Sequence, residues 1–356
     1  MKFSSKLSIN IILLFFFLIA VISSGCAPTR WMPITERKME ITWPSSPNFS
    51  RVHYLGEING FQQTSRTLTS IVTGKSRDGK IIKPVAITVG PEDRLAIADQ
   101  GREGVHLYIP STQEYQFIYI AGDEKISTPV GLTFDNENRL YVTDSQLKKI
   151  LIFDSKGNYL SSIERAGQEY LERPTGIIFN QFDKRLYISD ALKHEILIFS
   201  LHGEFLGRIG SRGEKTGSLN FPTHLGTDYD GNIYVTDSIN FRAQIFSPIS
   251  KQWRQFGRHG DGSGDFASPK GIGVDSNSVI YVAETLFDSV QLFDKDGKFL
   301  LTIGSQGDGP GEFWMPSGLF IDHKDRLYVC DTYNQRIQFF QLATEPLPAN
   351  LFQGKK

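Results

Sequence analysis

Six copies of one pattern of apolar and polar residues recur along the chain at intervals of 45 to 48 residues. Each copy has a proline, a short apolar run, a turn, a Leu/Ile-Tyr-Val-x-Asp segment and an apolar segment ending in Phe. The prolines are Pro84, Pro129, Pro174, Pro222, Pro269 and Pro316. A fixed period of this length is typical of a repeat architecture.

The runs within each copy predict four β-strands. In the sixth copy, the segments 316–322, 326–331 and 337–340 are short apolar or alternating runs separated by polar turns, which is typical of strands. In the fifth copy, residues 299–303 form a fourth run after the turn pair Asp296-Gly297, which suits a tight hairpin. Four strands repeated six times predict an all-β chain folded as a six-bladed β-propeller around a central channel.

The first and last copies predict how the ring closes. The sixth copy stops after Phe340 without a fourth strand, whereas Tyr54-Leu-Gly-Glu-Ile58 matches the fourth strand at 299–303. We therefore expect residues 51–58 to form the outer strand of the last blade. Such pairing removes an exposed sheet edge.

The blades resemble NHL-repeat propellers, whose copies combine a proline-led strand, Tyr-Val-x-Asp and Asn-x-Arg-Ile-Gln-x-Phe. Segments 234–246 and 328–340 match this pattern closely, and the resemblance covers roughly residues 51–342, with blades starting near the six prolines. Blade one departs from it at 100–104, and blade five has Glu284 in place of the Asp. The arrangement also looks like bacterial six-bladed propeller lipoproteins. The resemblance implies a binding module, a sensor domain or, in a few relatives, a lyase.

The N-terminus predicts export and a lipid anchor. Residues 1–25 have a basic start and a twelve-residue apolar run at 11–22, which is typical of a signal peptide and too short to span a bilayer comfortably. Ser23-Ser-Gly-Cys26 resembles a lipobox, in which Cys26 is lipidated, although Ser23 stands where that motif prefers Leu. The alternative is an ordinary cleavage site with an incidental cysteine. The resemblance implies a periplasm-facing, lipid-anchored protein, with Ala27 favouring the outer membrane.

Three further segments flank the predicted strands. Residues 26–50 contain four prolines and are expected to form an extended tether. Residues 60–82 are expected to be a linker with a short amphipathic helix near 61–72, packed on one propeller face or lying on a membrane. Residues 343–356 are a C-terminal tail.

Charge and cysteine content narrow the function classes. The chain carries 38 basic and 39 acidic residues, and without residues 1–25 it would carry 36 basic against the same 39 acidic ones. A slightly acidic net charge argues against nucleic-acid binding, which requires a basic face. The two cysteines are Cys26 and Cys330, and Cys330 is expected to be a buried small apolar residue.

The acids that end the second strands invite two interpretations. Facing a channel they would suit a cation such as Ca²⁺, and at strand ends they would accept backbone N–H groups. Their recurrence in every blade favours the structural interpretation, with Lys149, Arg242 and Arg336 as partners five residues later. The acids are Asp99, Asp144, Asp190, Asp237, Glu284 and Asp331.

One histidine differs from the residues at the equivalent position of the other copies. His224 stands two residues after its proline, where the other copies have Gly or Ala, and is expected at a channel mouth. One histidine does not make a zinc site, which usually takes three protein ligands. The Gly-rich connectors at 210–217, 257–264 and 304–311 lack the ending of a phosphate loop and are interpreted as structural, with only weak indications of calcium binding.

The sequence thus favours a cell-envelope lipoprotein whose propeller binds a protein, peptide or glycan, with no cofactor expected. Loops after the acids carry Leu147, Leu192, Phe241, Leu286, Phe287 and Tyr333, which would form an apolar rim. The candidate binding residues are His224, Phe241, Phe287 and Tyr333; no catalytic or metal-ligating residue is assigned. The alternative is a Ca- or Zn-dependent lyase or hydrolase with its site in the channel.

Overall fold

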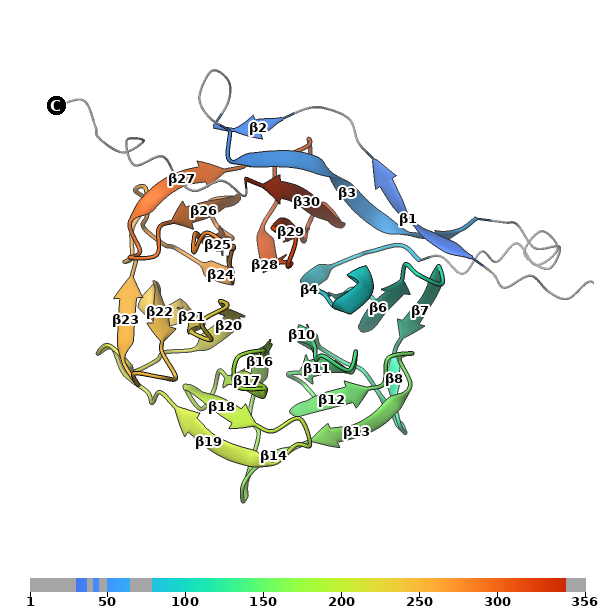
Figure 1. Ribbon diagram of the computed structural model, residues 1–356, viewed down its shortest axis with the longest axis horizontal. Coiled ribbons are helices and arrows are strands. Elements are labelled where there is room, and N and C mark those ends of the chain that lie inside the picture. The colour runs from blue at the N-terminus through green and yellow to red at the C-terminus, as the bar shows by residue number, and fades with distance from the viewer. Residues whose placement is uncertain (1–29, 37–40, 45–49, 65–78, 344–356) are drawn as a thin grey trace, which may run out of the picture.

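The computed structural model describes residues 30–36, 41–44, 50–64 and 79–343, and it shows six antiparallel β-sheets arranged as blades around one axis (Figure 1). The predicted all-β, six-bladed propeller is therefore confirmed. Apart from strands, the described residues contain two short 3₁₀ turns, η1 (Pro91–Asp93) and η2 (Ser238–Asn240). No helix among these residues is long and apolar enough to cross a membrane.

Each blade runs from an inner to an outer strand. The inner strands, each starting at one of the six prolines, are β4 (Pro84–Val89), β10 (Pro129–Phe134), β16 (Pro174–Asn180), β20 (Pro222–Thr227), β24 (Pro269–Val274) and β28 (Pro316–Ile321). The second strands are β5 (Leu95–Asp99), β11 (Leu140–Asp144), β17 (Arg185–Asp190), β21 (Ile233–Asp237), β25 (Ile280–Glu284) and β29 (Arg326–Asp331). The third strands are β6 (Gly104–Ile109), β12 (Lys149–Phe153), β18 (Glu195–Phe199), β22 (Arg242–Phe246), β26 (Ser289–Phe293) and β30 (Arg336–Leu342). The outer strands are β7 (Glu114–Ile118), β13 (Tyr159–Ile163), β19 (Phe205–Ile209), β23 (Trp253–Phe256), β27 (Phe299–Ile303) and β3 (Val52–Gln63).

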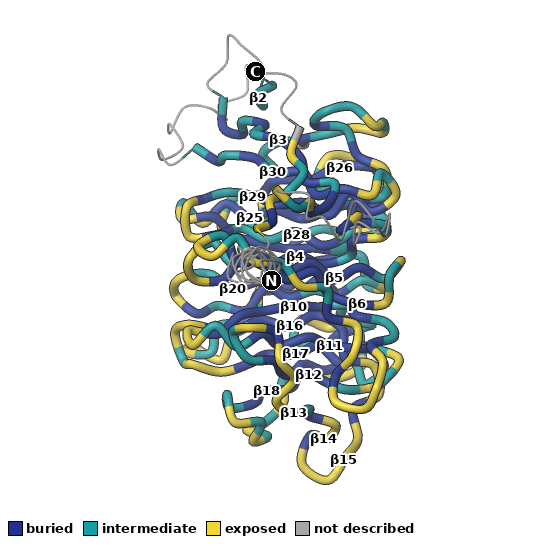
Figure 2. Tube along the Cα trace, turned by 90° about the vertical axis from the view of Figure 1, so that its right-hand side faces the viewer, coloured by how far each residue is buried: buried dark blue, intermediate teal, exposed yellow. Residues whose placement is uncertain are grey.

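Burial explains the residue pattern of each strand. The second strands are buried at almost every position, because both of their faces pack between neighbouring blades. The outer strands are exposed along much of their length, as in β13. Figure 2 shows the buried strands in the middle of the disc and exposed turns along its edges. Apolar side chains that alternate between two blade interfaces thus form the core.

The tyrosine in the second strands anchors the turn before it. The hydroxyl of Tyr281 donates to Asp275 Oδ2 at 3.0 Å, and the same Asp275 side chain accepts the backbone N–H groups of Asn277 and Val279. Blades two and four repeat this with Tyr141 and Tyr234. The Leu/Ile-Tyr-Val pattern is therefore set by a turn as well as by the core.

The ring is closed by the N-terminal strand, as predicted. Strand β3 pairs antiparallel with β30 as the outer strand of the last blade. Behind it, Arg336 Nη1 lies 2.6 Å from Glu57 Oε2, and Arg336 Nε lies 2.7 Å from Asp331 Oδ2. All three side chains are at least 93% buried, so the contact that joins the two ends of the chain is a buried charge network.

The expected tether and helix both need correction. Within the predicted tether, β1 (Trp31–Glu36) and β2 (Thr42–Trp43) are strands paired with β3, because the free edge of β3 offers unpaired N–H and C=O groups. Strand β3 also continues past residue 58 to Gln63, so Phe61, the expected start of the helix, lies in a strand and is 1% exposed. The rest of that segment, 65–78, lies outside the described residues, as do residues 1–29 with Cys26 and the tail from 344.

The connectors from each outer strand to the next blade have two forms. After blades one and two they are short hairpins, β8 (Ile120–Ala121) with β9 (Glu124–Lys125), and β14 (Arg165–Ala166) with β15 (Glu169–Tyr170). After blades three, four and five they are Gly-rich loops that insert Leu219, Phe266 or Phe313, each 0% exposed, into the core. The structural interpretation of these loops is confirmed.

Replacing Gly304 with alanine should destabilise the propeller by about 2–4 kcal/mol. Gly304 has a φ of +84°, and a Cβ there would lie 2.3 Å from Phe313 Cδ2. Gly203→Ala is the matched control, because Gly203 has the same φ but its Cβ would come no closer than 3.3 Å to Ile163. Chemical denaturation of both variants measures the difference, and equal losses would contradict the role of the inserted ring.

Candidate functional site

One face of the disc gathers the variable parts of the repeat. Each inner strand begins there, beside the end of the second strand, as the pairing of Pro129 with Asp144 and of Pro316 with Asp331 shows. The connectors and the loops between second and third strands lie on the same side, because β-strands alternate in direction. We call this side the connector face; the tight turns lie on the opposite face.

The six acids at this face hold the backbone together. Each is 0% exposed and accepts backbone N–H groups just before the proline of its own blade. Asp144, for example, accepts the N–H groups of Ser127 at 2.7 Å and Thr128 at 3.0 Å. The corresponding bonds in the other blades reach Asp99, Asp190, Asp237, Glu284 and Asp331. Their structural interpretation is therefore confirmed.

Two of the three predicted basic partners are found. Arg242 Nε lies 2.8 Å from Asp237 Oδ2, and Arg336 pairs with Asp331. The prediction for Lys149 is wrong: its Nζ lies 2.6 Å from Glu124 Oε2 and 3.0 Å from Glu164 Oε1. Glu124 lies in the hairpin β8–β9, which leads from blade one to blade two, and Glu164 directly follows β13, the outer strand of blade two.

The described residues show no cluster of side chains that matches the interpretation of the site as a metal centre. Across the part of the chain that the structure describes, no group of three or more His, Cys, Asp or Glu side chains is arranged to hold a metal ion. Cys330 is 0% exposed, as expected, and burial raises the pKa of its thiol.

The predicted apolar rim divides into packed and exposed side chains. Phe241 is half-buried, with its ring centroid 4.3 Å from that of His259, and Phe287 is also half-buried. Tyr333 is 48% exposed and lies against Trp314, which is equally exposed, at a centroid distance of 5.5 Å. Leu192 and Leu286 are exposed as well. The loop that carries Leu286 lies beside the Trp314–Tyr333 pair, since Asp288 Oδ1 accepts the backbone N–H of Met315 at 2.6 Å. We call Leu286, Trp314 and Tyr333 the apolar patch.

The sequence interpretation missed Trp314. Its position, two residues before the proline, holds Ile82, Ser127, Glu172, Asn220 and Ala267 in the other blades. The tryptophan could have been noticed from the sequence. This position of the repeat varies from blade to blade because it lies at the end of a connector, where no side chain is needed for the core, so a large aromatic residue there suggests another role.

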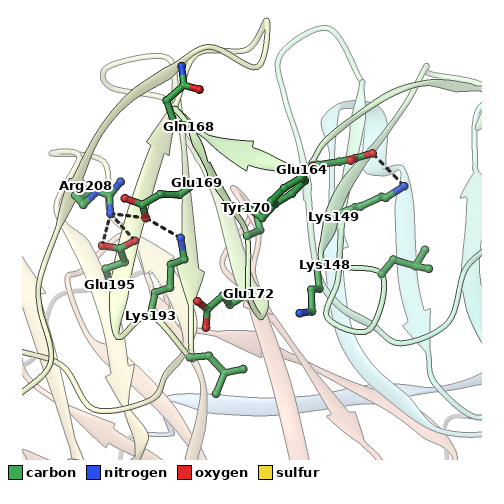
Figure 3. A pocket seen from close by; sticks show the side chains of 13 residues that line it. Lys148, Lys149, Glu164, Gln168, Glu169, Tyr170, Glu172, Lys193, Glu195 and Arg208 are labelled. Atoms are coloured by element: carbon green, nitrogen blue, oxygen red, sulfur yellow. Dashed lines mark hydrogen bonds and ion pairs between the residues drawn. The ribbon is translucent and has the colours of Figure 1, made fainter.

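A cavity of about 950 Å³ lies between blades two and three on this face, below the hairpin β14–β15. Figure 3 shows charged side chains from four chain segments around it, with Lys193 directed to Glu169 and Arg208 placed between Glu169 and Glu195. Lys149 and Glu164 form a pair on the other wall. Burial raises the pKa of Glu195. Most of the charges in the cavity thus have partners on its walls.

His224 lies on the inner strand of blade four, as expected from its distance to Pro222. It is partly exposed, its Nδ1 is buried, and no hydrogen bond joins either ring nitrogen to another described residue. Burial lowers the pKa of His224 to about 3, with the positive charge of Lys270 acting in the same direction. The imidazole is therefore neutral at ordinary pH. Among the described residues, no ring contact or hydrogen bond joins the His224 ring to Phe241 or Tyr333. Phe241 instead lies against His259, and Tyr333 lies against Trp314.

Comparisons with known proteins agree with this fold. A family model described as a six-bladed β-propeller matches residues 116–210 and 274–350, which is just under half of the chain. No curated protein sequence matches.

Solved structures resemble the chain over most of its length at low identity. A gluconolactonase from Xanthomonas campestris is 14% identical with a TM-score of 0.60, covering 89% of this chain and 99% of its own. A virginiamycin B lyase from Staphylococcus aureus, solved with quinupristin, is 13% identical with a TM-score of 0.54, covering 73% and 95%. A chain of a nidogen/laminin complex is 17% identical with a TM-score of 0.52, covering 71% and 92%. At such identities the likeness concerns the fold alone, and it identifies this chain as a six-bladed β-propeller.

Proposed function

We propose that this propeller is a binding module whose connector face docks a protein or peptide, and that it works as a lipid-anchored protein of the bacterial cell envelope. The proposal of a lipid anchor rests on the sequence of residues 1–26. The proposal of a docking face rests on the surface of the disc.

The apolar patch is the observation that carries the docking proposal. Leu286 is 59% exposed, and the rings of Trp314 and Tyr333 lie against each other at a tilt of 38° while each remains 48% exposed. Large aromatic side chains contribute most where they are fully desolvated at the centre of an interface. The cavity beside the hairpin β14–β15 adds a charged recess on the same face. A partner with an apolar segment flanked by charged residues fits this combination.

The alternative function is a metal-dependent lyase or hydrolase. His224, a neutral imidazole without a hydrogen-bond partner among the described residues, is the observation in its favour. The gluconolactonase and the lyase share the fold, and fold does not carry activity across. The apolar patch has no part in such a reaction, which is why docking is the preferred proposal.

Cross-linking from both faces tests the docking proposal. A photoreactive amino acid at position 286 or 333 should trap one defined envelope protein in cells. The same residue at Tyr229 or Ile249, which are 66% and 68% exposed on the opposite face, should not. Equal trapping from both faces would overturn the proposal.

The double substitution Trp314→Ser and Tyr333→Ser should reduce trapping from position 286 by at least about tenfold, since a hot-spot pair contributes 2 kcal/mol or more. The melting temperature should stay close to that of the parent protein, because both rings are half-exposed. Undiminished trapping with an intact fold would show that the patch does not bind the partner. Release of product from a lactone or cyclic depsipeptide, lost on adding a chelator, would favour the enzyme instead.

A further inference from the structure

Three basic or imidazole side chains, those of Arg173, His224 and Lys270, stand at the starts of the three adjacent inner strands β16, β20 and β24. The residue after each proline is small or uncharged in five blades, namely Val85, Val130, Thr175, Thr223 and Ser317, and it is Lys270 in blade five. On the adjacent inner strand, β20, the next position carries His224. Lys270 and His224 are partly exposed although they stand on the innermost strands of their blades.

Lys270 has no anionic partner. Its ammonium group forms neither a hydrogen bond nor an ion pair within 4 Å with any described residue. Burial lowers its pKa, and the positive charge of Arg173 lowers it further. The carboxylate of Glu284 acts on Lys270 in the opposite direction, but it already accepts the backbone N–H groups of Ala267 and Ser268. A cation held in such surroundings lacks the compensation that buried charges normally have.

Arg173 adds a second unpaired cation. It precedes Pro174 at the start of the inner strand of blade three and is exposed, with its guanidinium carbon 5.7 Å from the centre of the Phe221 ring. Among the described residues no carboxylate lies within ion-pair distance of it. The contrast with the neighbouring cavity is sharp, since Lys149, Lys193 and Arg208 there all have acidic partners.

His224 supplies hydrogen-bonding capacity without charge. Its neutral ring offers one N–H donor and one acceptor nitrogen, and both lack a partner within the described part of the chain. A polar group buried without a partner costs free energy, which a ligand atom in the right place would recover.

We propose that Lys270, Arg173 and His224 form a binding site for an oxyanion, a carboxylate or phosphate group, at the axial mouth of the connector face. Lys270 and Arg173 supply the opposite charge, and the imidazole of His224 supplies a hydrogen bond. This site is separate from the apolar patch, and it does not depend on protein docking.

Binding of inorganic phosphate and of acetate, each at constant ionic strength set with chloride, tests the site. Calorimetric titration of the soluble chain should show saturable binding of at least one of the two anions. The preferred anion at ten times its dissociation constant should raise the melting temperature by about 2–4 °C. Stronger binding of phosphate would point to a phosphorylated ligand, and stronger binding of acetate to a carboxylate ligand.

Matched variants tie the binding to the three residues. Lys270→Met and Arg173→Gln should each weaken binding at least tenfold, whereas Lys156→Met, on an exposed turn of the opposite face, should leave it unchanged. Lys270→Met should melt no lower than the parent protein, because it removes an unpaired cation. Arg173 is exposed, so its variant tests the site even if position 270 tolerates no change.

A spectroscopic readout locates the ion directly. The ¹⁵N shifts of the His224 ring should move with the same saturation curve as the calorimetry. Unchanged affinity in Lys270→Met and Arg173→Gln, or no saturable binding of either anion to the parent protein, would overturn the proposal.

Discussion

Replacing Arg336 with alanine is expected to lower the free energy of unfolding by about 3–5 kcal/mol, the loss that follows when one partner of a buried ion pair is removed. Arg336 contacts both Glu57 and Asp331, and its Nη2 donates to the carbonyl oxygens of Gly309 and Glu312. Without the guanidinium, two carboxylates would remain buried with reduced compensation. Chemical denaturation of the chain from residue 27 onward measures the loss.

Arg242→Ala provides the control. Arg242 occupies the equivalent position in blade four, where it contacts the single carboxylate of Asp237 and does not bridge the two ends of the chain. We expect Arg242→Ala to lower the free energy of unfolding by less than Arg336→Ala does. A double-mutant cycle of Glu57→Gln and Arg336→Ala should show a coupling energy of about 1–3 kcal/mol. Additive effects would mean that the contact does not contribute to ring closure.

Acidification is expected to destabilise the folded protein through His224. Its pKa is about 3 in the folded state against an ordinary value of 6.5, so below pH 6.5 the unfolded chain binds a proton that the folded protein excludes. The stabilising contribution is complete above pH 6.5 and is lost progressively as the pH falls toward 3. Because the ring is partly accessible, we expect a loss of about 2–3 kcal/mol by about pH 4.

The comparison of the parent protein with His224→Gln isolates this contribution. Other groups titrate in the same range: burial lowers the pKa of His106, whereas it raises the pKa of Asp275 to about 6. Asp275 works in the opposite direction, since its folded form keeps a proton that the unfolded chain releases, and it adds stability as the pH falls. Both groups are present in the two proteins, so they cancel in the difference. Parallel stability curves between about pH 7.5 and 4 would contradict the prediction.

The blades and the closing strand could be predicted because they are copies. Residues 54–58 repeat the apolar pattern of other outer strands, and that repetition is enough to identify the closing strand from the amino-acid sequence alone. The strands β1 and β2 have no copy elsewhere in the chain. They form because β3 leaves a free edge to which a nearby extended segment can pair, even one that contains Pro33. No pattern of residues in the sequence predicts such an edge.

The candidate site residues could be predicted only where one position of the repeat could be compared across the six copies. His224 stood out because its neighbours in the column are small, and Lys270 and Trp314 could have been found in the same way. The cavity near the hairpin β14–β15 could not be predicted from the sequence. Its walls come from segments spread from Leu147 to Arg208, and its ion pairs depend on how the hairpin folds. The half-burial of Phe241 likewise depends on the His259 ring, which only the fold brings near it.

The contact between Glu57 and Arg336 spans 279 positions of the chain. During synthesis or export, strand β3 emerges before every other blade strand and its partner β30 after all of them, so the ring stays open until nearly the whole chain is available. Bringing such distant segments together makes folding slow, because the entropy of a long loop is lost before the contact forms. The unpaired strand is meanwhile a target for chaperones and proteases, and a ribosome that stops before residue 336 releases a chain that cannot close.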